Sequence, residues 1–259
     1  MNTSYQEIAA QLALAEQKRI GLSPLSETYP GLTAEQAYAI QNAWFDMKLA
    51  EHAHLIGHKI GLTSKAMQVS LGVDQPDYGF LLDTMVVSPG STLSRDTFLL
   101  PRVEPEIAFW LTKDVCGPGV TIEDVLAATK GVSPSLELVD SRITNWRIKL
   151  VDTIADNASS ARVIVQQEMV SLSGLDLKEV QVVLTRNGET VGTGNGAAVL
   201  GHPAAAVAWL ANKLAEFDVS LLAGQLVLPG AMCAAVPVAA GEVYRATFTS
   251  LGEVSVRFE

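Results

Sequence analysis

The chain has 259 residues and is 48% hydrophobic, so it can bury a full core as one large domain or as one domain with a smaller appendage. Its net charge of −10 at pH 7 argues against a nucleic-acid partner, which would need an electropositive face. Cys116 and Cys233 form no Cys-x-x-Cys motif, and no apolar run reaches the roughly 18 residues of a membrane span. We therefore expect a cytoplasmic protein with no membrane partner.

Two helical patterns open the chain. Apolar positions recur at helical spacing over residues 4–19, and Thr33-Ala-Glu-Gln36 is a capping box, which predicts that a second helix begins there. From Leu55 the pattern changes to short strands bounded by glycines. We expect a helical N-terminal part over residues 1–54 and a β-rich catalytic body over residues 55–259.

A lysine lies inside the first predicted strand, Ile56–Lys65, which leads into a helical segment ending near Leu71 and Gly72. A buried lysine needs an anionic partner, so Lys59 is a candidate catalytic residue, although a surface lysine fits the local pattern about equally well. His58 would project from the opposite face of the strand.

An aspartate follows in Asp74–Gly79, a segment whose composition predicts a turn before a strand over Phe80–Val87. Aspartates in such loops usually cap the turn. Loops also place acid–base groups on a rigid scaffold, so Asp77 is a second candidate catalytic residue.

Three glutamates are the strongest candidates for chemistry. Glu104 and Glu106 alternate along a strand that is predicted to begin near Arg102, so both project from one face, with Cα atoms roughly 7 Å apart. Glu137 lies in a second apolar run of strand character, and pairing of the two strands would bring it to the same wall. Pro105 lacks an N–H, which indicates a sheet edge or a bulge.

The glutamates could instead lie on the solvated face of a half-exposed strand. The flanking runs Ile107–Leu111 and Val132–Val139 are almost wholly apolar, which favours strands buried on both faces. Three buried carboxylates cannot all stay ionised without a cation, because burial and like charges both raise their pKa values. Oxygen ligands without cysteine or a nearby histidine favour Mg²⁺ or Mn²⁺ over Zn²⁺.

The remainder of the chain shows strands with few helices between them. A helix is predicted from Thr121 to about Thr129, whereas Asp152–Ser160 is polar and poor in helix signal, so its hydroxyls could line a pocket or satisfy a turn. Further expected elements are a type I′ hairpin at Asn187-Gly188, a helix over Pro203–Phe217, and strands over Gln225–Leu228, Val243–Thr249 and Glu253–Phe258. This order favours an α+β fold with a mixed, β-rich body over a doubly wound α/β sheet.

Several motifs together resemble the hydratase/decarboxylase family of aromatic meta-cleavage pathways. In chain order they are Gly57–Lys65, Leu71–Gly79, Arg102–Glu106, Glu137–Arg142 and Ala155–Ser159. The resemblance implies a fumarylacetoacetate-hydrolase-like β-rich body, a Mg²⁺ or Mn²⁺ site, a small-molecule 2-oxo acid substrate and a homo-oligomer. It leaves open a complex with a pathway decarboxylase or aldolase.

The resemblance also implies roles for individual residues. The three glutamates match the family's metal ligands, in agreement with the charge argument, and Lys59, Asp77 and Ser160 match positions around the substrate. Arg142 is available to bind a substrate carboxylate. The chain departs from many hydratases in carrying Gly230-Ala231 where they carry Gly-Ser, so one hydroxyl that could contact substrate is absent.

The activity that the resemblance implies is a lyase reaction, the metal-dependent addition of water to 2-hydroxypenta-2,4-dienoate (2-oxopent-4-enoate), giving 4-hydroxy-2-oxopentanoate. The alternative on the same scaffold is decarboxylation of 4-oxalocrotonate, which needs a cation for the second carboxylate; Arg142 and Arg162 are available. A C–C bond hydrolase is a weaker alternative, because no clear His–Glu pair could activate water. A non-catalytic carboxylate metal-binding protein is the alternative from a different class.

Overall fold

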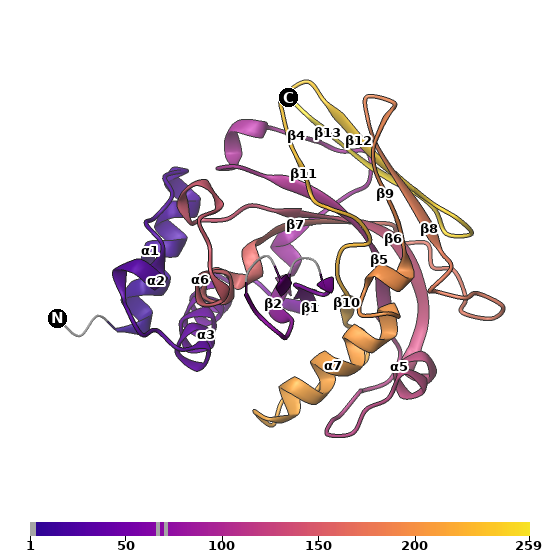
Figure 1. The fold of residues 1–259 in the computed structure, drawn as a ribbon, viewed down its shortest axis with the longest axis horizontal. Coiled ribbons are helices and arrows are strands. Elements are labelled where there is room, and N and C mark those ends of the chain that lie inside the picture. The colour runs from indigo at the N-terminus through magenta and orange to yellow at the C-terminus, as the bar shows by residue number, and fades with distance from the viewer. Residues whose placement is uncertain (1–3, 66–67, 70–71) are drawn as a thin grey trace.

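A computed structural model describes residues 4–65, 68–69 and 72–259 (Figure 1). The helices are α1 (Tyr5–Lys18), α2 (Leu25–Thr28), α3 (Ala34–Ala50), α5 (Ile122–Ala128), α6 (Leu150–Ala155) and α7 (Pro203–Ala215). The strands are β1 (Leu55–Gly61), β2 (Asp77–Leu82), β3 (Val86–Val87), β4 (Thr92–Leu93), β5 (Arg102–Leu111), β6 (Thr129–Val139), β7 (Ser160–Val165), β8 (Gln181–Arg186), β9 (Glu189–Asn195), β10 (Leu226–Leu228), β11 (Val236–Pro237), β12 (Val243–Phe248) and β13 (Gly252–Phe258). The helical segment predicted to end near Leu71 lies partly outside the described residues. Within the described part, no helix combines the length and apolar character needed to cross a membrane.

The N-terminal helices begin where their capping residues predict. The Thr33 hydroxyl accepts the Gln36 N–H at 3.2 Å, and the Gln36 side chain accepts the Thr33 N–H at 3.0 Å, which completes the capping box of α3. Apolar side chains of α1 and α3, among them Leu12, Ile40 and Trp44, are buried in a core shared with the body. The helices form one flank of the molecule, with α3 packed on α6 and α6 against β2 (Figure 1).

The larger sheet has eight strands, seven of them in the order β2-β1-β10-β5-β6-β7-β3, and the eighth, β11, pairs with β5. The prediction that Pro105 marks an edge or bulge is wrong, because β5 has neighbours on both sides and pairs with β6 in unbroken register around it. On the other side of β5 the strand ladder is interrupted between β10 and β11, where the Met232 N–H donates to the Pro105 carbonyl. A residue without an N–H is tolerated at such an interruption.

The smaller sheet has five strands in the order β4-β13-β12-β8-β9. Its strands β12 and β13 pack against β6 of the larger sheet, and α7 packs against α5 and β1. Asn187 and Gly188 join β8 to β9 with φ angles of 51° and 87°, the left-handed conformation of a type I′ hairpin. The α+β fold expected from the sequence is confirmed.

Two predictions of irregular structure are wrong. Asp77 is the first residue of β2 and pairs with Gly61 of β1, so it lies on a strand and not in the preceding turn. Leu150–Ala155 forms α6 although its sequence has a weak helix signal. The carboxylate of Asp152 accepts the N–H groups of Lys149 at 2.8 Å and Ser26 at 2.9 Å, which caps α6 and ties it to α2. Tertiary contacts thus override local propensity.

Candidate active site

The pairing of β5 with β6 brings three glutamates together. Glu104 lies directly across from Glu137, and Glu106 follows on the same face of β5. One oxygen from each carboxylate lies within 4.8 Å of the others. Glu106 and Glu137 are fully buried and Glu104 is half-buried. The strand alternation seen in the sequence therefore gives the convergence that was expected.

These carboxylates crowd one another electrostatically. Burial, together with the nearby charge of Glu137, raises the pKa of Glu104 to about 7, and the same causes raise the pKa of Glu106 well above its usual value. The Gly230 N–H donates to Glu106 Oε2 at 2.7 Å, whereas Glu106 Oε1 and both oxygens of Glu137 accept no hydrogen bond from the described residues, and Glu137 Oε2 has an ion-pair contact with Lys59. Buried carboxylate oxygens that accept no hydrogen bond in such a cluster fit a hard divalent cation, which prefers oxygen ligands.

Lys59 completes the cluster from β1. Its Nζ lies 3.2 Å from Glu137 Oε2 and donates to the Ala158 carbonyl at 3.1 Å. Burial by itself would lower the pKa of Lys59, but the surrounding carboxylates, Glu137 foremost, outweigh it and raise the pKa, so the ammonium stays charged. The expectation that Lys59 needs an anionic partner is met by Glu137.

Asp77 lies beside Lys59 on the neighbouring strand. Thr153 donates a hydrogen bond to Asp77 Oδ2 at 3.0 Å, and Oδ1 has no hydrogen-bond partner among the described residues. Burial raises the pKa of Asp77, and the charge of Lys59 partly opposes this. A Cβ at Gly61, the pairing residue, would lie 2.2 Å from Asp77 Oδ1, so only glycine leaves space for this carboxylate.

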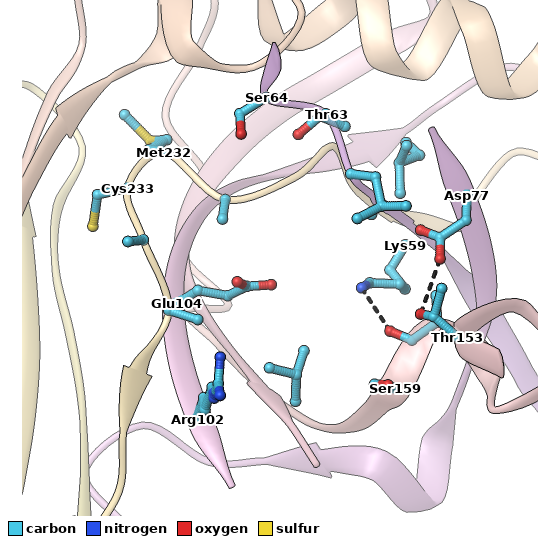
Figure 2. Close-up of a pocket in the computed structure, with 18 of the residues that line it drawn as sticks. Lys59, Thr63, Ser64, Asp77, Arg102, Glu104, Thr153, Ser159, Met232 and Cys233 are labelled. Atoms are coloured by element: carbon cyan, nitrogen blue, oxygen red, sulfur yellow. Dashed lines mark hydrogen bonds between the residues drawn. The ribbon is translucent and has the colours of Figure 1, made fainter. Parts of the chain in front are cut away.

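A cavity of about 530 Å³ is lined by Glu104, Lys59 and Asp77. Figure 2 shows Glu104 and Arg102 on one wall and Lys59 and Asp77 on the opposite wall. Other lining residues are mostly small or apolar and include Leu62, Thr63, Val139, Trp146, Ile148, Thr153, Ser159, Ala231 and Met232. A serine at position 231, which many hydratases carry in place of Ala231, would therefore place its hydroxyl in the cavity lining.

Four candidates from the sequence are not among the residues that line this cavity: Glu106 and Glu137, which are fully buried beside Glu104, and Arg142 and Ser160. The Arg142 guanidinium is 1% exposed and is bonded to the Asp156 carboxylate and to the carbonyls of Asp140 and Ser160. Ser160 lines a separate pocket beside Trp44, and its hydroxyl has no partner among the described residues. The geometry therefore gives neither Arg142 nor Ser160 a contact with a substrate bound at the glutamates.

Sequence reasoning missed Arg102, which lines the cavity, whereas the hydroxyls of Thr153 and Ser159 line it as one alternative for Asp152–Ser160 expected. The signal for Arg102 was available, because it precedes Glu104 by two residues in the same strand and so shares its face. Ser159 enters the cavity from a 3₁₀ turn over Asn157–Ser159. Arg162, the other arginine considered for a second carboxylate, lies over the ring of Phe98.

A family model described as fumarylacetoacetate (FAA) hydrolase C-terminal matches residues 49–259. The chain belongs to the fumarylacetoacetate hydrolase family. Among curated proteins, a 2-oxo-hept-4-ene-1,7-dioate hydratase from Escherichia coli is 45% identical, over 97% of this chain and 96% of its own length. A 2-keto-4-pentenoate hydratase from Paraburkholderia xenovorans is 41% identical, over 98% of this chain and 94% of its own length.

A solved structure has the same fold over nearly the whole chain. The structure of 4-oxalocrotonate decarboxylase from Pseudomonas putida G7, complexed with magnesium and adipate, gives a TM-score of 0.96 at 38% identity and covers 98% of this chain and 97% of that chain. The fold and the family likeness expected from the sequence are confirmed. The relatives that are 40–45% identical bear hydratase names in most cases and a decarboxylase name in one.

Proposed function

We propose that the protein is a Mg²⁺-dependent lyase that hydrates 2-hydroxypenta-2,4-dienoate to 4-hydroxy-2-oxopentanoate, in the catabolism of aromatic compounds by meta-cleavage. The observation that carries the proposal is the convergence of Glu104, Glu106 and Glu137 beside a cavity that Glu104, Lys59 and Asp77 line. The hydratase names of the relatives support the reaction class.

The three glutamates would hold the cation, and Mg²⁺ or Mn²⁺ suits an all-oxygen donor set. A cation bound there supplies a Lewis acid for the 2-oxo group and an anchor for the 2-oxo acid. The magnesium in the related decarboxylase structure supports this choice of ion.

Lys59 and Asp77 are the proposed proton-handling residues. The reaction needs the enol proton to leave the 2-hydroxydienoate and a proton to reach C5, which gives the 2-oxo-3-enoate. Water then adds across the C3=C4 bond, with its oxygen bonding to C4 and a proton reaching C3. Lys59 donates one N–H to the Ala158 carbonyl and forms an ion pair with Glu137, so a remaining N–H can carry the proton or stabilise developing negative charge. Asp77 Oδ1, which is unpartnered, can orient or deprotonate the water.

The test follows the ultraviolet absorbance of the dienoate with Mg²⁺ present. Wild-type protein is expected to consume the diene, and the Lys59→Met and Asp77→Asn variants are expected to lose at least about 100-fold in kcat, as is typical for removal of a general acid–base group. Glu189→Gln, which changes an exposed carboxylate on β9, serves as the control. Full activity of Lys59→Met would remove the proposed mechanism, and a chain that consumes no dienoate would remove the proposed function.

Decarboxylation of 4-oxalocrotonate is the second candidate, because a solved structure that covers 98% of this chain is such a decarboxylase. Assays of the dienoate and of oxalocrotonate, run side by side, separate the two functions. Loss of diene absorbance without release of CO₂ supports hydration. Release of CO₂ from oxalocrotonate at a higher kcat/KM than hydration would favour the decarboxylase.

We also propose that the protein is a cytoplasmic homo-oligomer. The two cysteines are free thiols, as expected in a reducing compartment. Phe217, Val219 and Leu222 expose between 43% and 49% of their surface just after α7, which is typical of an apolar surface that another subunit covers. Mass measurement by light scattering tests the oligomer, and a monomer at micromolar concentration would contradict it.

A further inference from the structure

Arg102 is a cation of the cavity wall that the proposed reaction does not use. It precedes Glu104 on β5 by two residues, so the two side chains share one face of the strand, with Cα atoms about 7 Å apart. Figure 2 shows both residues on one wall of the cavity. Within the described part of the chain, the only interaction of its guanidinium is a stack on an aromatic ring.

That ring belongs to Trp146, which holds the guanidinium in place. The Arg102 Cζ lies 4.5 Å from the centroid of the indole, and the indole N–H donates to the Leu100 carbonyl at 2.8 Å, which fixes the ring. A guanidinium stacked on a ring keeps its edge free, because its N–H donors lie in its own plane. The free edge is a preformed fork for the two oxygens of a carboxylate.

The other cation of the cavity is already engaged. Lys59 contacts Glu137 and the Ala158 carbonyl on the opposite wall. Among the described lining residues, Arg102 is therefore the cation that a substrate anion can reach without competing with a protein carboxylate within 4 Å. The lining residues Val139 and Ile148 are apolar, so their side chains offer no polar group that would compete with a substrate carboxylate for the Arg102 guanidinium.

We propose that Arg102, stacked on Trp146, binds a second carboxylate at the end of the substrate remote from the 2-oxo acid. The inference rests on the proposed hydratase reaction and extends its substrates beyond the pentadienoate, which has no second carboxylate, to 2-hydroxydienoates whose carbon chain ends in one. With the 2-oxo acid at the glutamates, an extended spacer of four or five bonds reaches about 5–6 Å, comparable with the spacing of Glu104 and Arg102 along the strand. A dicarboxylate then binds better than a monocarboxylate of equal length.

Two saturated acids test this directly, because neither can be hydrated. 2-Oxoadipate and 2-oxohexanoate have the same six-carbon chain and the same 2-oxo acid end, and they differ only in the terminal carboxylate. Their dissociation constants are measured by calorimetry with Mg²⁺ present. Wild-type protein is expected to bind 2-oxoadipate about 20-fold more tightly or better, the scale of a charge-assisted fork.

The variants assign that preference to a residue. In Arg102→Gln the preference for 2-oxoadipate should fall to about twofold or less, and in Arg102→Lys, which keeps the charge but loses the fork, it should be intermediate. Trp146→Leu should weaken the preference by releasing the guanidinium. The matched control is Arg245→Gln, which removes an exposed arginine that pairs with Glu253 on the smaller sheet, and it should keep the wild-type preference.

Equal binding of the two acids by wild-type protein overturns the inference without any variant. It is also overturned if Arg102→Gln weakens the binding of both acids by the same factor, because Arg102 would then bind the 2-oxo acid end that they share. Failure of the proposed function has a different signature, since a protein that hydrates no dienoate could still show the binding preference and its loss in Arg102→Gln.

Discussion

Arg142 and Asp156 form a buried ion pair, with Arg142 Nε 2.6 Å from Asp156 Oδ1, immediately before a turn of three left-handed residues. Asn157, Ala158 and Ser159 have φ angles of 54°, 47° and 54°, a conformation that costs non-glycine residues roughly 1–2 kcal/mol each. The ion pair holds this turn, and the turn aims the Ala158 carbonyl at the Lys59 ammonium. A pair outside the cavity thus positions a group inside it.

Replacing Asp156 by Asn should destabilise the protein by about 3–5 kcal/mol, because it leaves the guanidinium of Arg142 charged and unpaired in the core. The turn should also loosen, so kcat should fall more than KM rises. Asp152→Asn is the control: Asp152 is equally buried but caps α6 through Ser26 and Lys149 without a cation, so about 1–2 kcal/mol is expected. Urea denaturation measures the free energy of unfolding of both variants, and equal losses of stability would contradict the ion-pair argument.

A site residue could be predicted from the sequence where short-range patterns set its position, and could not where tertiary packing sets it. Glu104 and Glu137 could be placed because strand alternation and pairing of two long apolar strands are visible in the sequence. The position of Ser160 could not be predicted, because the left-handed turn directs Ser159, and not Ser160, into the cavity. Nothing in an Asn-Ala-Ser sequence signals three successive left-handed residues. Arg142 looked available because its partner, Asp156, lies 14 residues away in the sequence and meets it only through tertiary packing.

The fold was predictable for a related reason. Capping boxes, the Asn-Gly hairpin and the periodic helix after Pro203 are short-range signals, and each marks an element that the structure contains. The edge position predicted for Pro105 failed because the order of strands in the sheet is set by long-range pairing. A proline is compatible with an interior strand wherever the neighbouring ladder is broken, and single-sequence patterns do not show this.

His58 should make the stability of the protein depend on pH. It is buried on the face of β1 opposite Lys59, and burial lowers its pKa to about 4. The unfolded chain takes up the proton near pH 6.5, but the folded chain does so only near pH 4, so this contribution to stability is complete above about pH 6.5 and is lost as the pH falls towards 4.

Between pH 7 and pH 5 the free energy of unfolding should therefore drop by about 2 kcal/mol more in wild-type protein than in His58→Leu. Urea denaturation at the two pH values measures the difference. His52→Asn, which changes an exposed histidine in a left-handed conformation that Asn tolerates, should keep the wild-type dependence. An identical pH dependence in His58→Leu would show that His58 is not the group responsible.

Glu106→Gln should separate the metal site from the stability of the fold. Without metal, the substitution removes one of three crowded carboxylates while its carbonyl oxygen can still accept the Gly230 N–H, so the melting temperature should stay equal or rise. With Mg²⁺ at 100 times its dissociation constant, wild-type protein should gain about 2.7 kcal/mol and the variant little. Thermal melts with Mg²⁺ and with EDTA measure both effects, and an equal Mg²⁺ shift in the two proteins would exclude Glu106 as a ligand.

Gly61→Ala should act on catalysis through Asp77. The new methyl group would lie 2.2 Å from Asp77 Oδ1, so the carboxylate must move, and overpacking of this kind costs about 1–3 kcal/mol of stability. We expect kcat to fall at least about tenfold, because the displaced oxygen is the unpartnered one. A double-mutant cycle decides the route: if the methyl group acts by displacing Asp77, then adding Gly61→Ala to Asp77→Asn should lower kcat little further. Fully additive losses would mean that the methyl group disturbs the cavity in another way.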